Sequence, residues 1–163
     1  MSIEQTFTSL KTFVESSSAI KNTLCALKEG TEFGITIGDV VQCALSCKNG
    51  EVVLEKRAAN KPDLIFYVKP ESVGVITGQN GDQMATLSAA VGKEVLAGNI
   101  HVELTSNLRA LLDHGYIEML KKTGGEWSNK LMEVITQQAF TQAMKASATL
   151  ENIKKALKID SRK

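Results

Sequence analysis

Apolar side chains recur at helical spacing over the first 28 residues. They are Ile3, Phe7, Leu10, Val14, Ile20, Leu24 and Leu27. Steps of three and four residues place such side chains on one face of an α-helix. Ser2 and Gln5 have the spacing of a capping box, which predicts that the helix begins there. Serine is a poor helix former, so the run Ser16–Ser18 predicts a break between two helices, the second of which ends before Gly30.

The hydrophobic period then changes to two, which is the period of a strand with one buried face. This alternation predicts five strands, over residues 33–37, 41–47, 51–57, 63–69 and 99–105. Gly38-Asp39 predicts a tight turn. Asn49-Gly50 predicts a hairpin turn, because both residues tolerate a positive φ. The first three strands are therefore expected to be antiparallel neighbours.

Helical spacing returns on either side of the last strand. Pro70 suits the first turn of a short helix that ends at Gly78. Asp82 is the expected N-cap of a second helix, which ends at Gly98. Ser106 is the expected N-cap of a single long helix that follows the last strand.

A last helical region is expected over residues 127 to about 157. The chain shows no internal repeat and no low-complexity linker, so we expect one domain over residues 1–163. The order of elements predicts an α+β fold, in which helices cover a largely antiparallel five-stranded sheet. Extra helices are expected at both ends of the chain.

The charge balance argues against a nucleic-acid partner. The chain has nineteen basic and eighteen acidic residues, which gives a formal net charge of +1. Nucleic-acid binders, in contrast, usually carry a strong basic excess. The N-terminal residues lack the basic and apolar regions of a signal peptide, and no uncharged stretch is long enough to span a membrane. We therefore expect a soluble cytoplasmic protein with at most transient membrane contact.

The cysteines support the same location. Cys43 and Cys47 lie four positions apart on a predicted strand, about 13 Å at 3.3 Å per residue, which is too far for a disulfide between them. Cys25 has no partner at a metal-like spacing. We expect three free, buried thiols in a reducing compartment.

No constellation of catalytic residues is found in the sequence. His101 and His114 lack acidic or cysteine partners at metal-chelating spacing, so no zinc site is expected. His114 is expected at the surface, near the end of a helix. The glycines at positions 74, 78 and 81 are expected in turns, because no basic residue joins them as in a phosphate-binding loop. We expect no enzymatic activity, no cofactor and no metal.

The order of elements over Val41 to Leu120 resembles the sterol carrier protein type two (SCP2) lipid-binding domain. The matching features are a hairpin with a glycine-bearing turn (residues 47–51), a strand that opens on Asp63, and a short helix that ends in glycine (residues 70–78). A second helix then follows a polar turn, and a strand of alternating apolar residues leads into an amphipathic helix. The resemblance implies an SCP2-like core over about residues 31–122, with a C-terminal helical extension over 126–158.

The resemblance also implies an apolar tunnel between the sheet and its helices, which binds a sterol, fatty acid, acyl-CoA or phospholipid without converting it. The residues that it places at the tunnel are Val73, Ile76, Met84, Leu87, Val91, Ile100, Val102, Leu108, Leu111 and Leu112. The extra C-terminal helix could close the tunnel as a lid or form a homodimer. The alternative function is a protein-interaction module, or a dimeric accessory subunit with a filled core.

Overall fold

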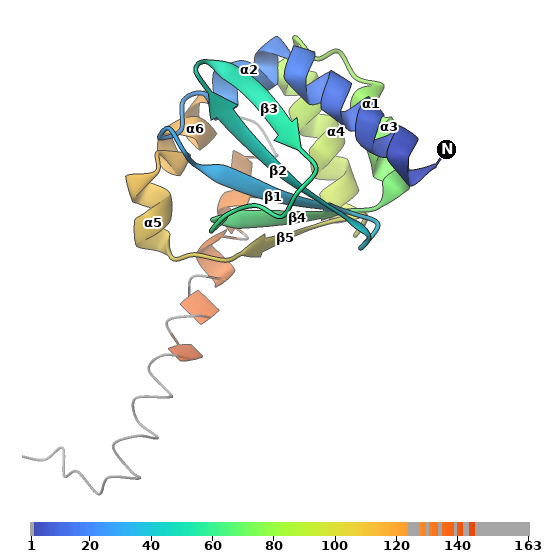
Figure 1. Ribbon diagram of the computed structural model, residues 1–163. Helices are drawn as coiled ribbons and strands as arrows, with labels where there is room; N and C mark the ends of the chain where they lie inside the picture. The colour runs from blue at the N-terminus through green and yellow to red at the C-terminus, as the bar shows by residue number, and fades with distance from the viewer. Residues whose placement is uncertain are drawn as a thin grey trace, which may run out of the picture.

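The fold is a five-stranded sheet with helices packed on one face (Figure 1). The computed structural model describes residues 2–123 and, beyond them, 128–129, 131–133, 135–138, 140–141 and 144–145. The strands are β1 (Glu32–Ile37), β2 (Val41–Lys48), β3 (Glu51–Glu55), β4 (Leu64–Val68) and β5 (Ile100–Leu104). Their spatial order is β3-β2-β1-β4-β5. The predicted α+β fold is confirmed.

Three of the four strand pairings are antiparallel, and β1 pairs with β4 in parallel. The turns at Gly38-Asp39 and Asn49-Gly50 have positive φ angles, so the first three strands form a meander, as predicted. The meander leaves one edge of β1 free, and β4 joins that edge. Ile35 lies opposite Cys43 on one side and Phe66 on the other, so the odd positions of β1 and β2 share a face with the even positions of β4.

The N-terminal residues form two helices, α1 (Ile3–Ser16) and α2 (Ser18–Leu24). The predicted capping box is present, because Ser2 and Gln5 each accept a hydrogen bond from the other's backbone N–H. The predicted break is also confirmed. Ser17 ends α1, and its side chain caps α2 by accepting from the backbone N–H of Ile20 at 3.1 Å.

Two helices connect β4 to β5, namely α3 (Pro70–Thr77) and α4 (Met84–Leu96). Pro70 begins α3, as predicted. The prediction that Asp82 caps α4 is wrong. Gln83 occupies that position without a side-chain cap, and Asp82 instead accepts a hydrogen bond from the Ser18 hydroxyl at 2.7 Å.

The helix predicted after β5 is divided into α5 (Leu108–Asp113) and α6 (Tyr116–Thr123). Gly115 lies between them with a φ of 86°, a left-handed conformation that breaks a helix. The predicted cap is also one residue out of place. Asn107, not Ser106, caps α5 by accepting from the backbone N–H of Ala110 at 2.9 Å.

The described residues of the C-terminal extension contact the domain. Ser128, Leu131 and Ile135 are buried, at the three- and four-residue spacing of one helix face. The Gln138 amide reaches the outer edge of β5, where it donates to the Val102 carbonyl at 2.9 Å and accepts from the Leu104 N–H at 2.5 Å. Trp127 and residues 146–158 of the predicted extension lie outside the described residues.

The expectation of three free thiols is wrong. Cys25, where α2 ends, forms a disulfide with Cys47 of β2, and their Cα atoms are 5.3 Å apart. Strand spacing excluded a Cys43–Cys47 bond correctly, but it carried no information on where the end of a helix would pack. Cys43 is free, and burial raises the pKa of its thiol to about 11. Because disulfides are rare in reducing compartments, the cysteines no longer support a cytoplasmic location, which stays a prediction.

We expect the Cys25–Cys47 disulfide to stabilise the fold. It joins residues 22 positions apart, and a closed loop of this size contributes about 3 kcal/mol, chiefly by restricting the unfolded chain. Replacing both cysteines by serine should lower the free energy of unfolding by that amount in urea titrations. Dithiothreitol should destabilise the wild type similarly and leave the double variant unchanged. Labelling of three thiols in protein purified without reductant would contradict the pairing.

Candidate functional site

An apolar cavity of about 190 Å³ lies between the inner face of the sheet and the helices. Each strand except β3 contributes side chains to its floor. They are Phe33, Ile35, Leu45, Phe66, Val68 and Ile100. The pairing registers explain why these residues meet, since Ile35 lies opposite Phe66, and Val68 lies opposite Ile100. The alternation of apolar residues along the strands therefore places these side chains on the face of the sheet that forms the cavity floor.

Helices α3 and α4 form one wall of the cavity. Met84, Leu87, Ser88 and Val91 of α4 line it, at spacings of three and four residues that place them on one face of the helix. Val73 and Ile76 of α3 complete this wall. Ile76, Met84 and Val91 are half-buried, so this wall extends from the interior towards the protein surface.

The opposite wall comes from the N-terminal helices. Leu10 and Val14 of α1 and Leu24 of α2 are buried and line the cavity, together with Ile20 and Thr23. These helices precede the stretch that resembles the SCP2 domain, so the resemblance did not include them. Their helical apolar periodicity was the available signal, but it does not distinguish a cavity wall from a filled core.

Two further residues come from the C-terminal half of the chain. Met119 of α6 and Leu131 of the extension both line the cavity, and Leu131 is buried. The extension is thus part of the wall. Its roles as a lid or in a homodimer both stay predictions.

The structure places six of the ten predicted tunnel residues at the cavity. These are Val73, Ile76, Met84, Leu87, Val91 and Ile100. Their contact with a ligand stays a prediction.

The remaining four predicted residues lie outside the cavity wall. Val102 and Leu111 are buried elsewhere in the core, whereas Leu108 and Leu112 are 45% and 56% exposed. Figure 1 shows α5, which carries Leu108, Leu111 and Leu112, at the end of the sheet away from α3. The contact of these four residues with a ligand also stays a prediction.

Among the described residues of the cavity wall, two are polar, Thr23 and Ser88. The Thr23 hydroxyl donates to the Ala19 carbonyl at 2.9 Å, so its proton is already used within α2. The Ser88 hydroxyl is buried and has no hydrogen-bond partner in the described part of the chain. None of the described wall residues is charged.

A cluster of charges lies instead on the other face of the sheet, which carries no helix layer. Arg57 pairs with Glu32 at 2.6 Å and with Glu55 at 3.1 Å, and Lys48 pairs with Glu55 at 2.7 Å. The Arg57 and Lys48 cations lower the pKa of Glu55 to about 2, and Arg57 also lowers the pKa of Glu32.

His114 differs from its expected surface role. It is half-buried, and its Nδ1 lies 2.6 Å from a carboxylate oxygen of Asp63, which is itself buried. The pair connects the end of α5 to the start of β4. Tyr116 is buried beside it, and burial together with the Asp63 carboxylate raises the pKa of Tyr116. Among the described residues, no group of three acidic, histidine or cysteine side chains could hold a metal ion.

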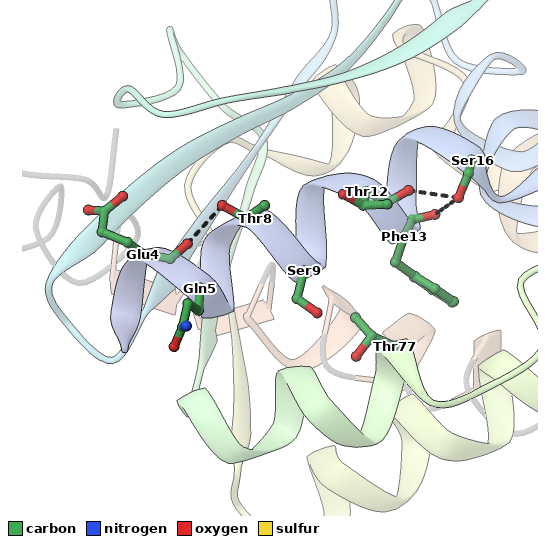
Figure 2. A pocket seen from close by; sticks show the side chains of 8 residues that line it. All are labelled: Glu4, Gln5, Thr8, Ser9, Thr12, Phe13, Ser16 and Thr77. Carbon is green, nitrogen blue, oxygen red and sulfur yellow. Dashed lines mark hydrogen bonds between the residues drawn. The ribbon is translucent and has the colours of Figure 1, made fainter. Parts of the chain in front are cut away.

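A second hollow, a groove of about 680 Å³, lies between α1 and α3 (Figure 2). Most of its lining residues are exposed and polar. The hydroxyls of Thr8 and Ser16 donate to carbonyls of their own helix, as Figure 2 shows, and Thr77 does the same in α3. The groove is an open, largely polar surface, so the apolar cavity is the better candidate site for an apolar ligand.

Comparisons with known proteins find a likeness among the solved structures. No protein-family model and no curated protein matches the chain. The structure is similar to a solved chain named "UbiJ-SCP2 Ubiquinone synthesis protein", with a TM-score of 0.42 and 14% sequence identity over 72% of this chain and 90% of that chain. That name includes the same SCP2 domain that the sequence resembles. A likeness at this level does not identify a ligand, which has to be inferred from the cavity.

In the part of the chain that the structure describes, no helix is long and apolar enough to cross a membrane.

The charge cluster on the open face predicts a loss of stability in acid. Glu55 has a folded pKa of about 2 against an ordinary value of 4.5, so its stabilising effect is complete above pH 4.5 and is lost as the pH falls towards 2. Replacing Arg57 by Gln should reduce this loss, measured as the melting temperature between pH 6 and pH 2. The exposed Lys93→Gln variant is the control and should follow the wild type. Parallel profiles for all three proteins would contradict the prediction.

Proposed function

We propose that this protein binds an apolar lipid ligand in the cavity between its sheet and its helices, and that it does so without catalysis. The observation that supports the proposal is the composition of the cavity wall. Seventeen of the nineteen described residues that line it are apolar, and they come from strands, from both N-terminal helices, from α3, α4 and α6 and from the extension. A core left partly unfilled by so many elements is physically a site for an apolar body.

The driving force would be the removal of apolar surface from water, at about 25 cal/mol per Å². At 190 Å³ the cavity is somewhat larger than the roughly 150 Å³ engineered cavity that takes up benzene. It is smaller than the roughly 300–1,000 Å³ typical of sites for drug-sized ligands. A sterol or a long acyl chain would therefore enter fully only if the wall moved outward.

The wall formed by α3 and α4 is the part best suited to such movement. At its far end, Glu94 accepts hydrogen bonds from Ser72 at 2.5 Å and from Asn99 at 3.1 Å. These bonds fix the C-terminal part of α4 to α3 and to the start of β5. The cavity-lining part of α4, from Met84 to Val91, lies between this attachment and the hydrogen bonds that Gly81 and Asp82 accept from the N-terminal helices. An outward movement of α4 about Glu94 would therefore require those bonds to open.

The absence of catalysis is part of the proposal. Hydrolytic and transfer reactions need a positioned acid, base or nucleophile next to the bound molecule. The described residues of the cavity wall offer the hydroxyls of Thr23 and Ser88 and no ionisable side chain that could activate them. Among the described residues, the histidine nearest to a carboxylate is His114, and it is not part of the cavity wall.

The direct test is native mass spectrometry of protein purified from cells, with extraction of any bound molecule. We expect a fraction of the protein to carry apolar molecules that organic solvent releases. Toluene, which matches the size of the cavity, should bind the delipidated protein and raise its melting temperature. Protein that carries no ligand and takes up no toluene would refute the proposal.

A variant that fills the cavity separates binding from folding. Val91→Phe places a larger side chain in the wall, so toluene uptake should be lost while the free energy of unfolding falls by less than about 1 kcal/mol. In a filled core the same change would cost roughly 1–3 kcal/mol. Val95→Phe, one turn further along α4 and outside the cavity wall, is the matched control and should keep uptake. Equal uptake by both variants would exclude this cavity as the site.

Exposed apolar side chains favour a second candidate function, an interaction module or homodimer. Phe140 and Met144 of the extension are 66% and 57% exposed, and they are four residues apart, as on one helix face. Leu108 and Leu112 have the same spacing on α5 and are also exposed.

The test of this second candidate is the molecular mass in solution, measured by light scattering over a range of concentrations. A dimer that becomes a monomer in the Phe140→Glu, Met144→Glu double variant would support it. A wild type that stays monomeric at the highest concentration would exclude the homodimer. Neither result would affect the toluene measurements, so the two candidate functions are tested separately.

A further inference from the structure

The unpartnered Ser88 hydroxyl points to the chemical class of the ligand. Ser88 is 4% exposed, and its oxygen has no hydrogen-bond partner among the described residues. It is a member of the cavity wall. Leaving a buried hydroxyl unpaired costs roughly 1–3 kcal/mol, so such groups usually have a partner in the functional state of a protein.

The position of Ser88 in α4 directs it towards the cavity. Leu87 and Ser88 are the buried members of the α4 wall, whereas Met84 and Val91 on either side are half-buried. The hydroxyl therefore lies deeper than the apolar side chains that flank it. Rotation about the single χ1 bond gives it three staggered directions, so it can turn to meet a bound group.

The rest of the wall limits what that group can be. Thr23, the other polar residue, already donates to the Ala19 carbonyl, and no lysine, arginine or histidine is among the described residues of the wall. A carboxylate or phosphate inside the cavity would lose its hydration without gaining a cation, which is strongly unfavourable. A neutral oxygen needs only one hydrogen bond, and a serine hydroxyl can either donate or accept it.

We propose that Ser88 is the polar contact of the cavity and that the ligand is a neutral amphiphile, which enters with a hydroxyl or carbonyl oxygen directed inward to Ser88. This inference rests on the proposed binding function. It selects neutral, oxygen-bearing apolar molecules over carboxylates and phosphate esters, whose charged ends would have to remain outside the cavity.

The experiment compares phenol with toluene, which have nearly the same shape and differ in one hydroxyl. Dissociation constants of both probes are measured by calorimetry for the wild type and for Ser88→Ala. The ratio of the phenol and toluene dissociation constants is then compared between the two proteins. This comparison isolates the coupling between the phenol hydroxyl and the Ser88 hydroxyl. We expect Ser88→Ala to lower the preference for phenol roughly fivefold, the effect of one neutral hydrogen bond. Toluene affinity should be unchanged.

Two further variants serve as a control and a replicate. Thr23→Val removes the hydroxyl that is already paired within α2 and keeps the side-chain shape, so it should leave the phenol-to-toluene ratio at the wild-type value. Ser88→Cys replaces the hydroxyl by a weak donor and should behave as Ser88→Ala does. Because the Ser88 hydroxyl has no partner to lose, neither change at this position should lower the melting temperature of the ligand-free protein.

The failures of the two proposals are distinguishable. If toluene binds both the wild type and Ser88→Ala, and the phenol-to-toluene ratio is the same in both, the Ser88 contact is overturned while the binding function stands. If the wild type takes up neither probe, the binding function falls and this inference falls with it. Benzoate should show no uptake at pH 7. Benzoate that binds as tightly as phenol would overturn the restriction to neutral ligands.

Discussion

The fold depends on covering one wide apolar face of a twisted sheet. Alternation along β1, β2, β4 and β5 directs their large apolar side chains to the same side, and such a face cannot remain in water. Helices α1 and α2 cover the β3 end, α4 covers the β5 end, and α3 lies between α1 and α4. Because the helices are cylinders on a curved surface, covering the face does not by itself fill the space beneath them. The cavity is the part of this interface that the side chains leave open.

The separation of charge and apolar surface follows from the same arrangement. Since the inner face is closed by helices, the strand residues that point outward meet solvent, and there Glu32, Lys48, Glu55 and Arg57 form their network of ion pairs. The described residues that line the cavity include no ionisable group. The two faces of one sheet thus provide an aqueous, charged surface on one side and an apolar space on the other.

Features encoded within a few residues were predictable, whereas contacts between distant segments were not. The Ser2–Gln5 capping box, the break at Ser17 and the Asn49-Gly50 turn depend on local backbone chemistry, and the structure has all three. The Cys25–Cys47 and Asp63–His114 contacts join segments far apart in the chain, and no local pattern indicates them. The cavity falls between these cases. Its residues on α3 and α4 were predictable from periodicity and resemblance, but Leu131 and the N-terminal wall required the packing itself.

The contact of Gln138 with the edge of β5 has a consequence for how the interior can be reached. An unpaired strand edge is a template for another strand, and the Gln138 amide occupies the Val102 carbonyl and the Leu104 N–H at that edge. Leu131, which lines the cavity, is seven positions earlier in a segment whose described residues are helical. A displacement of this segment that opens the cavity would also leave the β5 edge unpaired. Closure of the cavity and protection against strand-to-strand association are therefore linked, and a chain shortened before residue 131 would lose both.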